Sequence, residues 1–179
     1  MNIALIGYRG TGKTSIAQRL SLRLGWPWID ADVEIELAAG KSVATIFSDD
    51  GEERFRDLEV QITADLAQRN QHVLAFGGGV VLRDENRQWL RRLNAVIWLT
   101  AKASTIQQRM LADPATVARR PNLTSAGGLS EIIQLLTDRE PFYRECADMA
   151  VDTEDRAIEE IVDDILDRLG LSNVNPDSL

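Results

Sequence analysis

One short stretch near the start of the chain restricts its possible folds more than any other feature. Residues 7–14 read GYRGTGKT and match the pattern G-x-x-x-x-G-K-[ST]. The apolar run at residues 2–6 before it is typical of a buried strand, and residues 15–24 after it carry apolar side chains at helical spacing. A strand, a glycine-rich loop and a helix in this order are the context that a phosphate-binding loop requires.

The residue types in this phosphate loop (residues 7–14) fit a bound polyphosphate. Gly7, Gly10 and Gly12 permit backbone angles that other residues avoid, so that successive N–H groups can point into one anion-binding hollow. Lys13 supplies a charge for the outer phosphates, and the hydroxyl of Thr14 suits a magnesium ion. The alternative is a glycine-rich turn that matches by chance. However, the chain has only three lysines against seventeen arginines, and one lysine stands where phosphate loops use a point charge.

Composition argues against several classes of protein. The 179 residues, 44% hydrophobic and 27% charged, are typical of one globular domain. No apolar run approaches the ~18 residues of a transmembrane helix, and the immediate first strand leads us to expect no signal peptide. The net charge of −8 argues against a nucleic-acid surface, and a lone Cys146 argues against disulfides or a zinc site. We therefore expect a cytoplasmic protein with neither nucleic-acid nor membrane partners.

Short apolar runs alternate with helical patterns along the chain. The predicted strands cover residues 2–6, 26–30, 72–76, 95–99 and 149–152. The predicted helices cover residues 15–24, 33–40, 42–47, 52–69, 83–93, 129–145 and 154–169, and another begins at Ser104. This alternation favours a three-layer α/β domain, a five-stranded parallel sheet flanked by helices. We expect residues 1–179 to form this single domain, with a disordered tail at about residues 171–179.

Two local features should interrupt the helical pattern. Residues 49–51 (Asp-Asp-Gly) are expected to break the chain between the helices at 42–47 and 52–69. Pro141 lies inside the helix at 129–145, and it predicts a kink or a break there.

Two carboxylates follow the second predicted strand. Asp30 ends this strand, and Asp32 comes two residues later at the start of a short helix. Ligands bind at the carboxyl ends of the strands in open parallel sheets. Either residue could simply cap the helix, but capping accounts for only one of them. The pair, beside a phosphate loop, favours a magnesium and substrate site.

A second group of candidate residues lies further along the chain. Arg56 and Glu59 are three residues apart on a predicted helix and can touch, although a solvated surface ion pair is the simpler alternative. Residues 77–79 are three glycines at the end of the third strand, where bare backbone can approach a ligand closely. A flexible loop is the alternative for the glycines.

Residues 113–128 show neither helical nor strand periodicity. Arg119 and Arg120 lie in this segment next to Pro121, and long segments of this kind are usually functional or disordered. Arginines in a mobile lid could close over bound phosphates. The sequence predicts such a lid at about residues 112–126.

Together these features resemble those of the shikimate kinases, over nearly the full length of the chain. The phosphate loop comes first, and residues 28–32 (WIDAD) look like the Asp-x-Asp motif of that family. The remaining motifs, in the order of the family, are Phe55-Arg56 with Glu59, Gly77-Gly78-Gly79, Arg119-Arg120-Pro121, and Arg139 with Pro141 and Tyr143.

The resemblance implies a P-loop kinase fold similar to that of nucleoside monophosphate kinases, with a mobile lid. It implies transfer of the γ-phosphoryl group of ATP to the 3-hydroxyl of shikimate, giving shikimate 3-phosphate and ADP. This step belongs to chorismate and aromatic amino-acid biosynthesis. The family also implies Mg²⁺ as cofactor and a monomeric protein.

The resemblance further implies a role for each matching residue. Lys13, Asp32 and Arg120 would be catalytic, and Thr14 and Asp30 would hold Mg²⁺. The implied ATP-binding residues are Gly10, Thr11, Gly12, Lys13, Thr14, Ser15, Arg109, Arg120 and Thr153. The implied substrate-binding residues are Asp32, Arg56, Glu59, Gly77, Gly78, Gly79 and Arg139, and the segment at about residues 31–60 would bind the substrate. Arg56 and Arg139 would bind the shikimate carboxylate.

Other readings of the sequence stay open. Another P-loop small-molecule kinase, such as one acting on gluconate, would keep the phosphate loop without requiring both Arg56 and Arg139. A nucleoside monophosphate kinase should have a longer region after Asp32. A nucleotide-dependent switch should lack the Asp30/Asp32 pair. A catalytically silent domain should have lost Lys13, Asp32 or an arginine, and none of these is missing.

Overall fold

A parallel sheet forms the centre of the molecule in the computed structural model, which describes residues 1–112 and 128–172. The five strands are β1 (Ile3–Ile6), β2 (Trp28–Asp30), β3 (Val73–Ala75), β4 (Ala95–Thr100) and β5 (Met149–Asp152). Their order is β2-β3-β1-β4-β5, and every pair of neighbours runs parallel. The predicted five-stranded parallel sheet is therefore confirmed.

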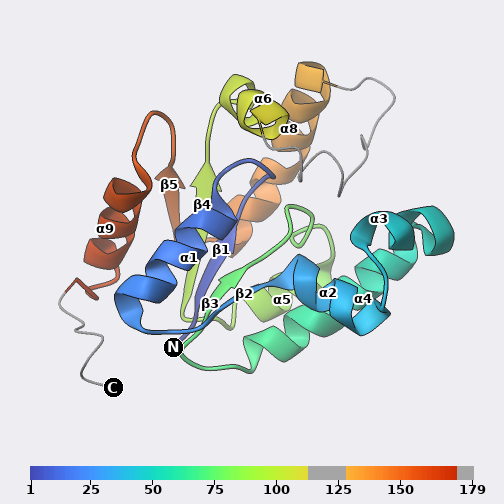
Figure 1. Ribbon diagram of the computed structural model, residues 1–179, viewed down its shortest axis with the longest axis horizontal. Coiled ribbons are helices and arrows are strands. Elements are labelled where there is room, and N and C mark those ends of the chain that lie inside the picture. The colour runs from blue at the N-terminus through green and yellow to red at the C-terminus, as the bar shows by residue number, and fades with distance from the viewer. Residues whose placement is uncertain (113–127, 173–179) are drawn as a thin grey trace.

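Helices cover both faces of this sheet (Figure 1). They are α1 (Lys13–Leu24), α2 (Ala31–Ala39), α3 (Val43–Thr45), α4 (Gly51–Ala67), α5 (Asp84–Leu90), α6 (Ala103–Ala112), α8 (Gly128–Cys146) and α9 (Ile158–Arg168), with a π-helical turn η1 (Ile46–Asp50). Side chains of α1 and α9 pack on one face of the sheet, and side chains of α4, α5 and α8 pack on the other. The predicted three-layer architecture is confirmed.

Strand β1 illustrates why the strands are apolar at every position. Ile3 and Leu5 enter the core beneath α1 and α9, whereas Ala4 and Ile6 enter the core on the opposite face. A strand that is covered on both faces has no solvent-facing side for polar residues. The lack of polar alternation in the sequence follows from this position in the middle of the sheet.

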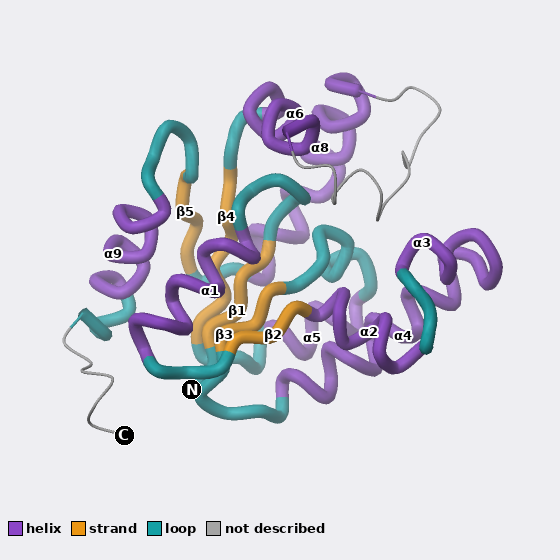
Figure 2. The backbone as a smooth tube through the Cα atoms, viewed as in Figure 1, coloured by secondary structure: helices purple, strands orange, loops and turns teal. Residues whose placement is uncertain are grey.

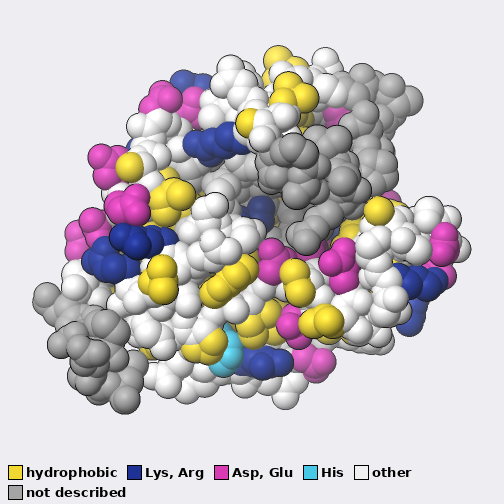
Figure 3. Space-filling view, in the orientation of Figure 1, with side chains coloured by type: hydrophobic (Ala, Val, Ile, Leu, Met, Phe, Trp, Pro, Cys, Tyr) yellow, Lys and Arg dark blue, Asp and Glu magenta, His cyan; other side chains and the backbone are white. Residues whose placement is uncertain are grey.

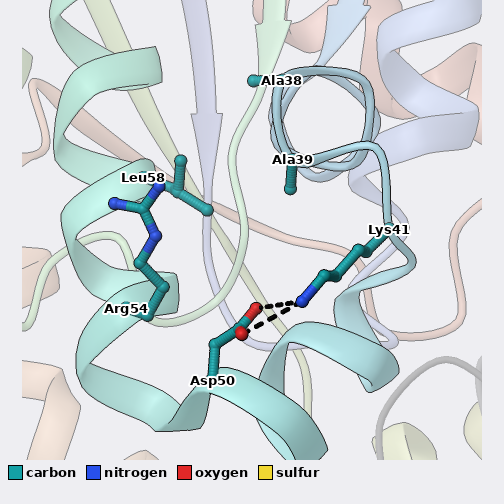
Figure 4. Close-up of a pocket in the computed structure, with 6 residues that line it drawn as sticks. All are labelled: Ala38, Ala39, Lys41, Asp50, Arg54 and Leu58. Carbon is teal, nitrogen blue, oxygen red and sulfur yellow. Dashed lines mark hydrogen bonds and ion pairs between the residues drawn. The ribbon is translucent and has the colours of Figure 1, made fainter.

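Helices α2, α3 and the first turns of α4 extend from the β2 edge of the sheet, at the right of Figures 1 and 2. Ile35, Val43 and Phe55 are buried in a small core of their own there. Figure 4 shows the ion pair at the end of this unit, where Lys41 Nζ donates to both carboxylate oxygens of Asp50 at 3.0 and 2.7 Å. The ion pair joins the loop after α2 to the start of α4.

The break expected at residues 49–51 is confined to one residue. Asp49 and Asp50 belong to the π-helical turn, and only Gly51 has a positive φ, of 85°. The N–H of Gly51 donates to Ile46 O, so the wider turn accommodates the residues that the sequence analysis placed in a break. Gly51 then begins α4 in a new direction.

Pro141 does not break its helix, and that alternative of the prediction is wrong. Helix α8 runs without interruption from Gly128 to Cys146, with Pro141 inside it. Proline removes one backbone hydrogen bond and crowds the preceding turn. Buried side chains hold the helix on both sides of it, Arg139 before and Tyr143 after. These tertiary contacts offset the local cost.

The carboxyl ends of all five strands meet at one edge of the sheet (Figure 2). The phosphate loop follows β1, Asp30 ends β2, the glycine turn (residues 77–79) follows β3, and Thr153 follows β5. The topology therefore brings segments that are far apart in the sequence to one place.

Two surface features bear on the expected partners. No helix in the described ranges is both long enough and apolar enough to cross a membrane. On the face shown in Figure 3, basic side chains lie interspersed with acidic ones. The absence of nucleic-acid partners stays a prediction.

Candidate active site

The phosphate loop adopts the conformation for which its glycines are needed. Gly7, Gly10 and Gly12 all have positive φ, of 137°, 79° and 91°. A side chain on Gly7 would also collide with the chain, because an added Cβ would lie 2.4 Å from Leu99 O. Helix α1 begins at Lys13, directly after Gly12. The loop N–H groups and the positive end of the α1 dipole can therefore act on the same anion.

Lys13 folds back across this loop. Its Nζ donates to Gly7 O at 2.9 Å and to Tyr8 O at 2.8 Å. The hydroxyl of Thr11 donates to the same Tyr8 carbonyl at 2.8 Å. Neutral carbonyl oxygens are weaker partners for an ammonium group than phosphate oxygens are. The lysine is thus held at the loop by contacts that a phosphate can replace or supplement.

Asp30 is both a helix cap and a candidate metal ligand. Its Oδ1 accepts from the N–H of Asp32 at 3.0 Å and caps α2. Its Oδ2 accepts from the hydroxyl of Thr14 at 3.3 Å. The capping alternative is therefore correct for one carboxylate oxygen, while the other faces the phosphate loop.

The surroundings of Asp30 disfavour its charged form. Burial and the carboxylate of Asp32 raise the pKa of Asp30 above its usual value, although hydrogen bonds and the charge of Lys13 act in the opposite direction. A divalent cation beside the carboxylate would remove this cost. Thr14 and Asp30 offer two adjacent oxygens, and Mg²⁺ typically takes one or two protein oxygens and completes its shell with phosphate and water. The donor set fits Mg²⁺.

The Arg56–Glu59 pair is buried, so the alternative of a solvated surface pair is wrong. Arg56 is 8% exposed and Glu59 is 3% exposed. Arg56 NH1 donates to Glu59 Oε2 at 2.8 Å. Arg56 Nε and NH2 also donate to Glu52 Oε1, at 3.1 and 2.9 Å. The sequence analysis missed Glu52, although its position four residues before Arg56 on a helix was the available signal.

The glycine turn packs against two other parts of the site. A Cβ on Gly79 would lie 2.2 Å from Arg56 NH1, and a Cβ on Gly78 would lie 3.3 Å from Gly7 O. Gly79 leaves room for the guanidinium group of Arg56, and Gly78 allows the turn to pack against the phosphate loop. This close packing favours a structural or ligand-binding role for these glycines over a flexible loop.

Arg139 reaches the same turn from α8. It is 7% exposed, and its NH1 donates to Gly78 O at 3.2 Å. Tyr143, one turn later, donates its hydroxyl to the same carbonyl at 2.5 Å. The sequence analysis quoted Tyr143 without giving it a role, since no local pattern connects it with Gly78.

A cavity of about 320 Å³ lies between the phosphate loop, Arg109 of α6 and Thr153 after β5. Arg109 crosses it, donating to Thr153 Oγ1 at 2.9 Å and to Thr153 O at 2.8 Å. Its lining residues include Gly10, Thr11, Gly12, Ser15, Arg109 and Thr153. The sequence analysis missed Met110 and Arg156, which also line this cavity.

A larger cavity, of about 510 Å³, lies beside the Lys41–Asp50 ion pair of Figure 4. Its lining residues are Ala38, Ala39, Lys41, Asp50, Arg54 and Leu58. All six lie in the predicted substrate-binding segment at about residues 31–60, but none is among the individually predicted site residues. Cavity size therefore does not identify the site in this molecule, whereas the convergence of charged groups at the sheet edge does.

Positively charged side chains gather around the phosphate loop and the glycine turn. Lys13, Arg56, Arg109 and Arg139 come from four different helices, and each contacts the phosphate loop or the glycine turn. Arg120 and nearly all of the predicted lid at about residues 112–126 lie outside the described residues, as does most of the predicted tail.

Comparisons with known proteins agree with this arrangement. The family model described as shikimate kinase matches residues 9–170. A shikimate kinase of Rhodopirellula baltica is 39% identical over 165 residues, which cover 92% of this chain and 88% of that protein. A shikimate kinase of Symbiobacterium thermophilum is 41% identical over 169 residues, 94% of this chain and 96% of that protein.

A solved structure agrees as well. The shikimate kinase of Acinetobacter baumannii in complex with shikimate superposes with a TM-score of 0.88 at 32% sequence identity. The superposition covers 97% of this chain and 95% of that chain. The similarity of the fold therefore extends over nearly the whole chain.

Proposed function

The chain belongs to the shikimate kinase family, and we propose how the residues of this site carry out that reaction. The protein is a phosphotransferase with an alcohol acceptor, and it transfers the γ-phosphoryl group of ATP to the 3-hydroxyl of shikimate. One observation carries the assignment of residues. Two buried arginines, Arg56 and Arg139, meet a single glycine turn whose backbone packs against the phosphate loop.

The donor binds on the β1 side of the site. The loop N–H groups and Lys13 hold the β- and γ-phosphates, and Arg109 with Thr153 flanks the adenine. Arg120, which lies outside the described residues, stabilises the transferring phosphoryl group as the resemblance implies. Thr14 and Asp30 would hold Mg²⁺. When bound, this ion neutralises charge on the phosphate oxygens.

The acceptor binds between α2, α4 and α8. Arg56 and Arg139 bind its carboxylate, because a guanidinium group matches a carboxylate with two parallel hydrogen bonds. Glu59 and Glu52 fix the Arg56 side chain from both ends of its guanidinium group. Backbone N–H groups of the glycine turn contact the acceptor, since no side chain shields them.

Asp32 orients the 3-hydroxyl group of the acceptor. In the transfer step, the hydroxyl oxygen forms a bond to the γ-phosphorus while the bond between that phosphorus and the bridging oxygen of ADP breaks. The hydroxyl proton passes to the Asp32 carboxylate, and the bond electrons leave with ADP. Positioning and charge neutralisation supply most of the acceleration in such transfers.

We propose that the protein acts in the cytoplasm as a monomer. The similarity to curated shikimate kinases supports the first part of this proposal. The family resemblance supports the second.

The arginine assignment can be tested with the acceptor itself. ADP release in a coupled assay should depend on shikimate and should fall by roughly 30-fold or more in kcat/KM with its methyl ester, because the ester lacks the charge that the buried arginines bind. Equal use of acid and ester would contradict the assignment of Arg56 and Arg139.

Replacing Gly79 by alanine should weaken shikimate binding. The new Cβ would lie 2.2 Å from Arg56 NH1 and would force that guanidinium group away from its position. We expect KM for shikimate to rise by roughly tenfold, which corresponds to the loss of one charge-assisted hydrogen bond. KM for MgATP is the internal control and should stay within about twofold. An unchanged KM for shikimate would show that Arg56 does not need this space.

Replacing Asp30 by asparagine should raise thermal stability near pH 7 and raise the Mg²⁺ requirement. The pKa of Asp30 is raised above its usual 3.8, so its charged form costs stability in the folded protein. This cost is absent at pH values below the pKa that Asp30 has in the unfolded chain. It grows as the pH rises and is complete above the pKa that Asp30 has in the folded protein. The stability gain of Asp30→Asn should therefore vanish below about pH 4. Asparagine keeps the cap on α2.

Thermal melts at several pH values and Mg²⁺ titrations of activity measure both effects. Asp30→Ala is the matched control, because it removes the charge together with the cap and should lose much of the stability gain. A melting temperature of Asp30→Asn that falls at pH 7, with an unchanged Mg²⁺ requirement, would contradict both roles of Asp30.

A further inference from the structure

Tyr143 lies in the last turn of α8, beside the glycine turn of the site. It is fully buried, and its ring stacks on that of Trp98 from β4, with centroids 5.7 Å apart and an interplanar angle of 17°. Its hydroxyl donates to Gly78 O at 2.5 Å. A ring held in this way has little freedom, so the position of its hydroxyl is determined by the sheet and α8 together.

Gly78 connects the two halves of the proposed site. Its Cα lies so close to the phosphate loop that an added Cβ would be 3.3 Å from Gly7 O and 3.4 Å from Arg9 N. The next residue, Gly79, borders the guanidinium group of Arg56. A movement of Gly78 would therefore change the distance between the acceptor pocket and the phosphate loop.

The carbonyl of Gly78 has two donors with different expected roles. Tyr143 OH donates at 2.5 Å, and Arg139 NH1 donates at 3.2 Å. A carbonyl oxygen has two lone pairs and can accept both hydrogen bonds. If Arg139 turns to the carboxylate of shikimate, its bond to Gly78 weakens, while the bond from Tyr143 can persist. A buried carbonyl without any partner would be costly.

Burial raises the pKa of Tyr143, although the neighbouring charge of Arg139 opposes that rise. The hydroxyl therefore stays protonated and remains a donor at neutral pH.

We propose that Tyr143 is a positioning residue for the acceptor. Its hydroxyl holds Gly78 so that the glycine turn keeps its place against the phosphate loop when Arg139 engages shikimate. This inference rests on the proposed use of Arg139 and the glycine turn by the acceptor. Tyr143 itself touches neither substrate.

The test is Tyr143→Phe, which removes only the hydroxyl and keeps the stacked ring. We expect KM for shikimate to rise ~5–10-fold, as for the loss of one buried hydrogen bond, with KM for MgATP within about twofold of wild type. Cys146→Ala is the matched control. Cys146 lies in the same core cluster, one turn further along α8, so its truncation lowers stability without touching Gly78.

Two kinetic outcomes would overturn the proposal. In the first, Tyr143→Phe lowers the melting temperature but keeps the wild-type KM for shikimate. In the second, it raises KM for shikimate and KM for MgATP to the same degree, while the Cys146→Ala control leaves both values near those of the wild type. A wild-type protein that fails to phosphorylate shikimate would overturn the proposed function, and this inference with it.

Hydrogen exchange provides a second test. It needs only the wild-type protein, so it can be made even if Tyr143→Phe does not fold. The amides of Val80 and Leu82 donate to Gly77 O and Gly79 O at 3.1 and 3.0 Å and report on the turn. A turn already held by Tyr143 should show the same protection with and without shikimate. Amides that exchange freely until shikimate binds would overturn the proposal.

Discussion

Replacing Lys13 by alanine is expected to lower kcat by roughly 10²–10³-fold while the protein stays folded. Preorganised groups that stabilise charge in a transition state typically contribute this much, about 2.7–4 kcal/mol. Lys13 Nζ already lies on the loop carbonyls of Gly7 and Tyr8, so that little reorganisation is needed when phosphates bind. The fold should persist because the strands and α1 pack without this amine.

Steady-state kinetics and a thermal melt measure the two parts of this expectation. Lys102→Ala is the matched control, because the side chain of Lys102 is 72% exposed and its ion pair with Glu154 is 3.7 Å long. This control should keep near wild-type turnover. Loss of folding in Lys13→Ala, or turnover equal to that of the control, would contradict the role of Lys13.

Replacing Arg139 by alanine is expected to lower kcat/KM for shikimate by roughly 30-fold or more. Removing one partner of a buried charge pair typically costs about 2–5 kcal/mol. Arg139 is buried and contacts the glycine turn rather than the cavity beside Arg109. The loss should therefore concern the acceptor far more than MgATP.

The matched control for this variant lies on the same helix. Arg144 pairs with Glu140 at 2.7 Å on the surface, where its side chain is 67% exposed. Arg144→Ala should leave both substrate requirements unchanged, since surface ion pairs contribute little. If Arg139→Ala raises KM for shikimate and KM for MgATP equally, Arg139 does not bind the acceptor carboxylate.

The sheet could be predicted from sequence because its strands are covered on both faces. Each apolar run, such as residues 95–99, is too short for a helix and lacks polar alternation, and both properties follow from the burial of β4. Pro141 shows where such reasoning fails. Local chemistry predicts a kink or a break at this residue, and the break does not occur because buried contacts of Arg139 and Tyr143 keep α8 continuous.

The site divides in a similar way. The phosphate loop could be predicted because one contiguous motif carries its chemistry. The resemblance to a family supplied Arg56 and Arg139, but local spacing could not distinguish a buried Arg56 from a solvated one. Tyr143 and Gly78 are 65 residues apart, and only the packing of α8 against the sheet brings them together.

Asp30 is an intermediate case, because the structure confirms its role as a helix cap while its role at a magnesium site stays a proposal. One carboxylate oxygen caps α2, and the other accepts from Thr14. The sequence pattern treated the two roles of Asp30 as alternatives. A carboxylate has two oxygens, however, and each can accept from a different donor.

Phosphorus NMR of the purified protein with MgATP tests the central claim most directly, with shikimate in one sample and gluconate in another. Gluconate is also a carboxylate with several hydroxyl groups, so it tests whether the arrangement of Arg56, Arg139 and Asp32 selects the acceptor. We predict a new phosphomonoester signal, together with ADP, in the shikimate sample alone. A phosphomonoester signal in the gluconate sample, or none in either while ATP still binds, would contradict the account.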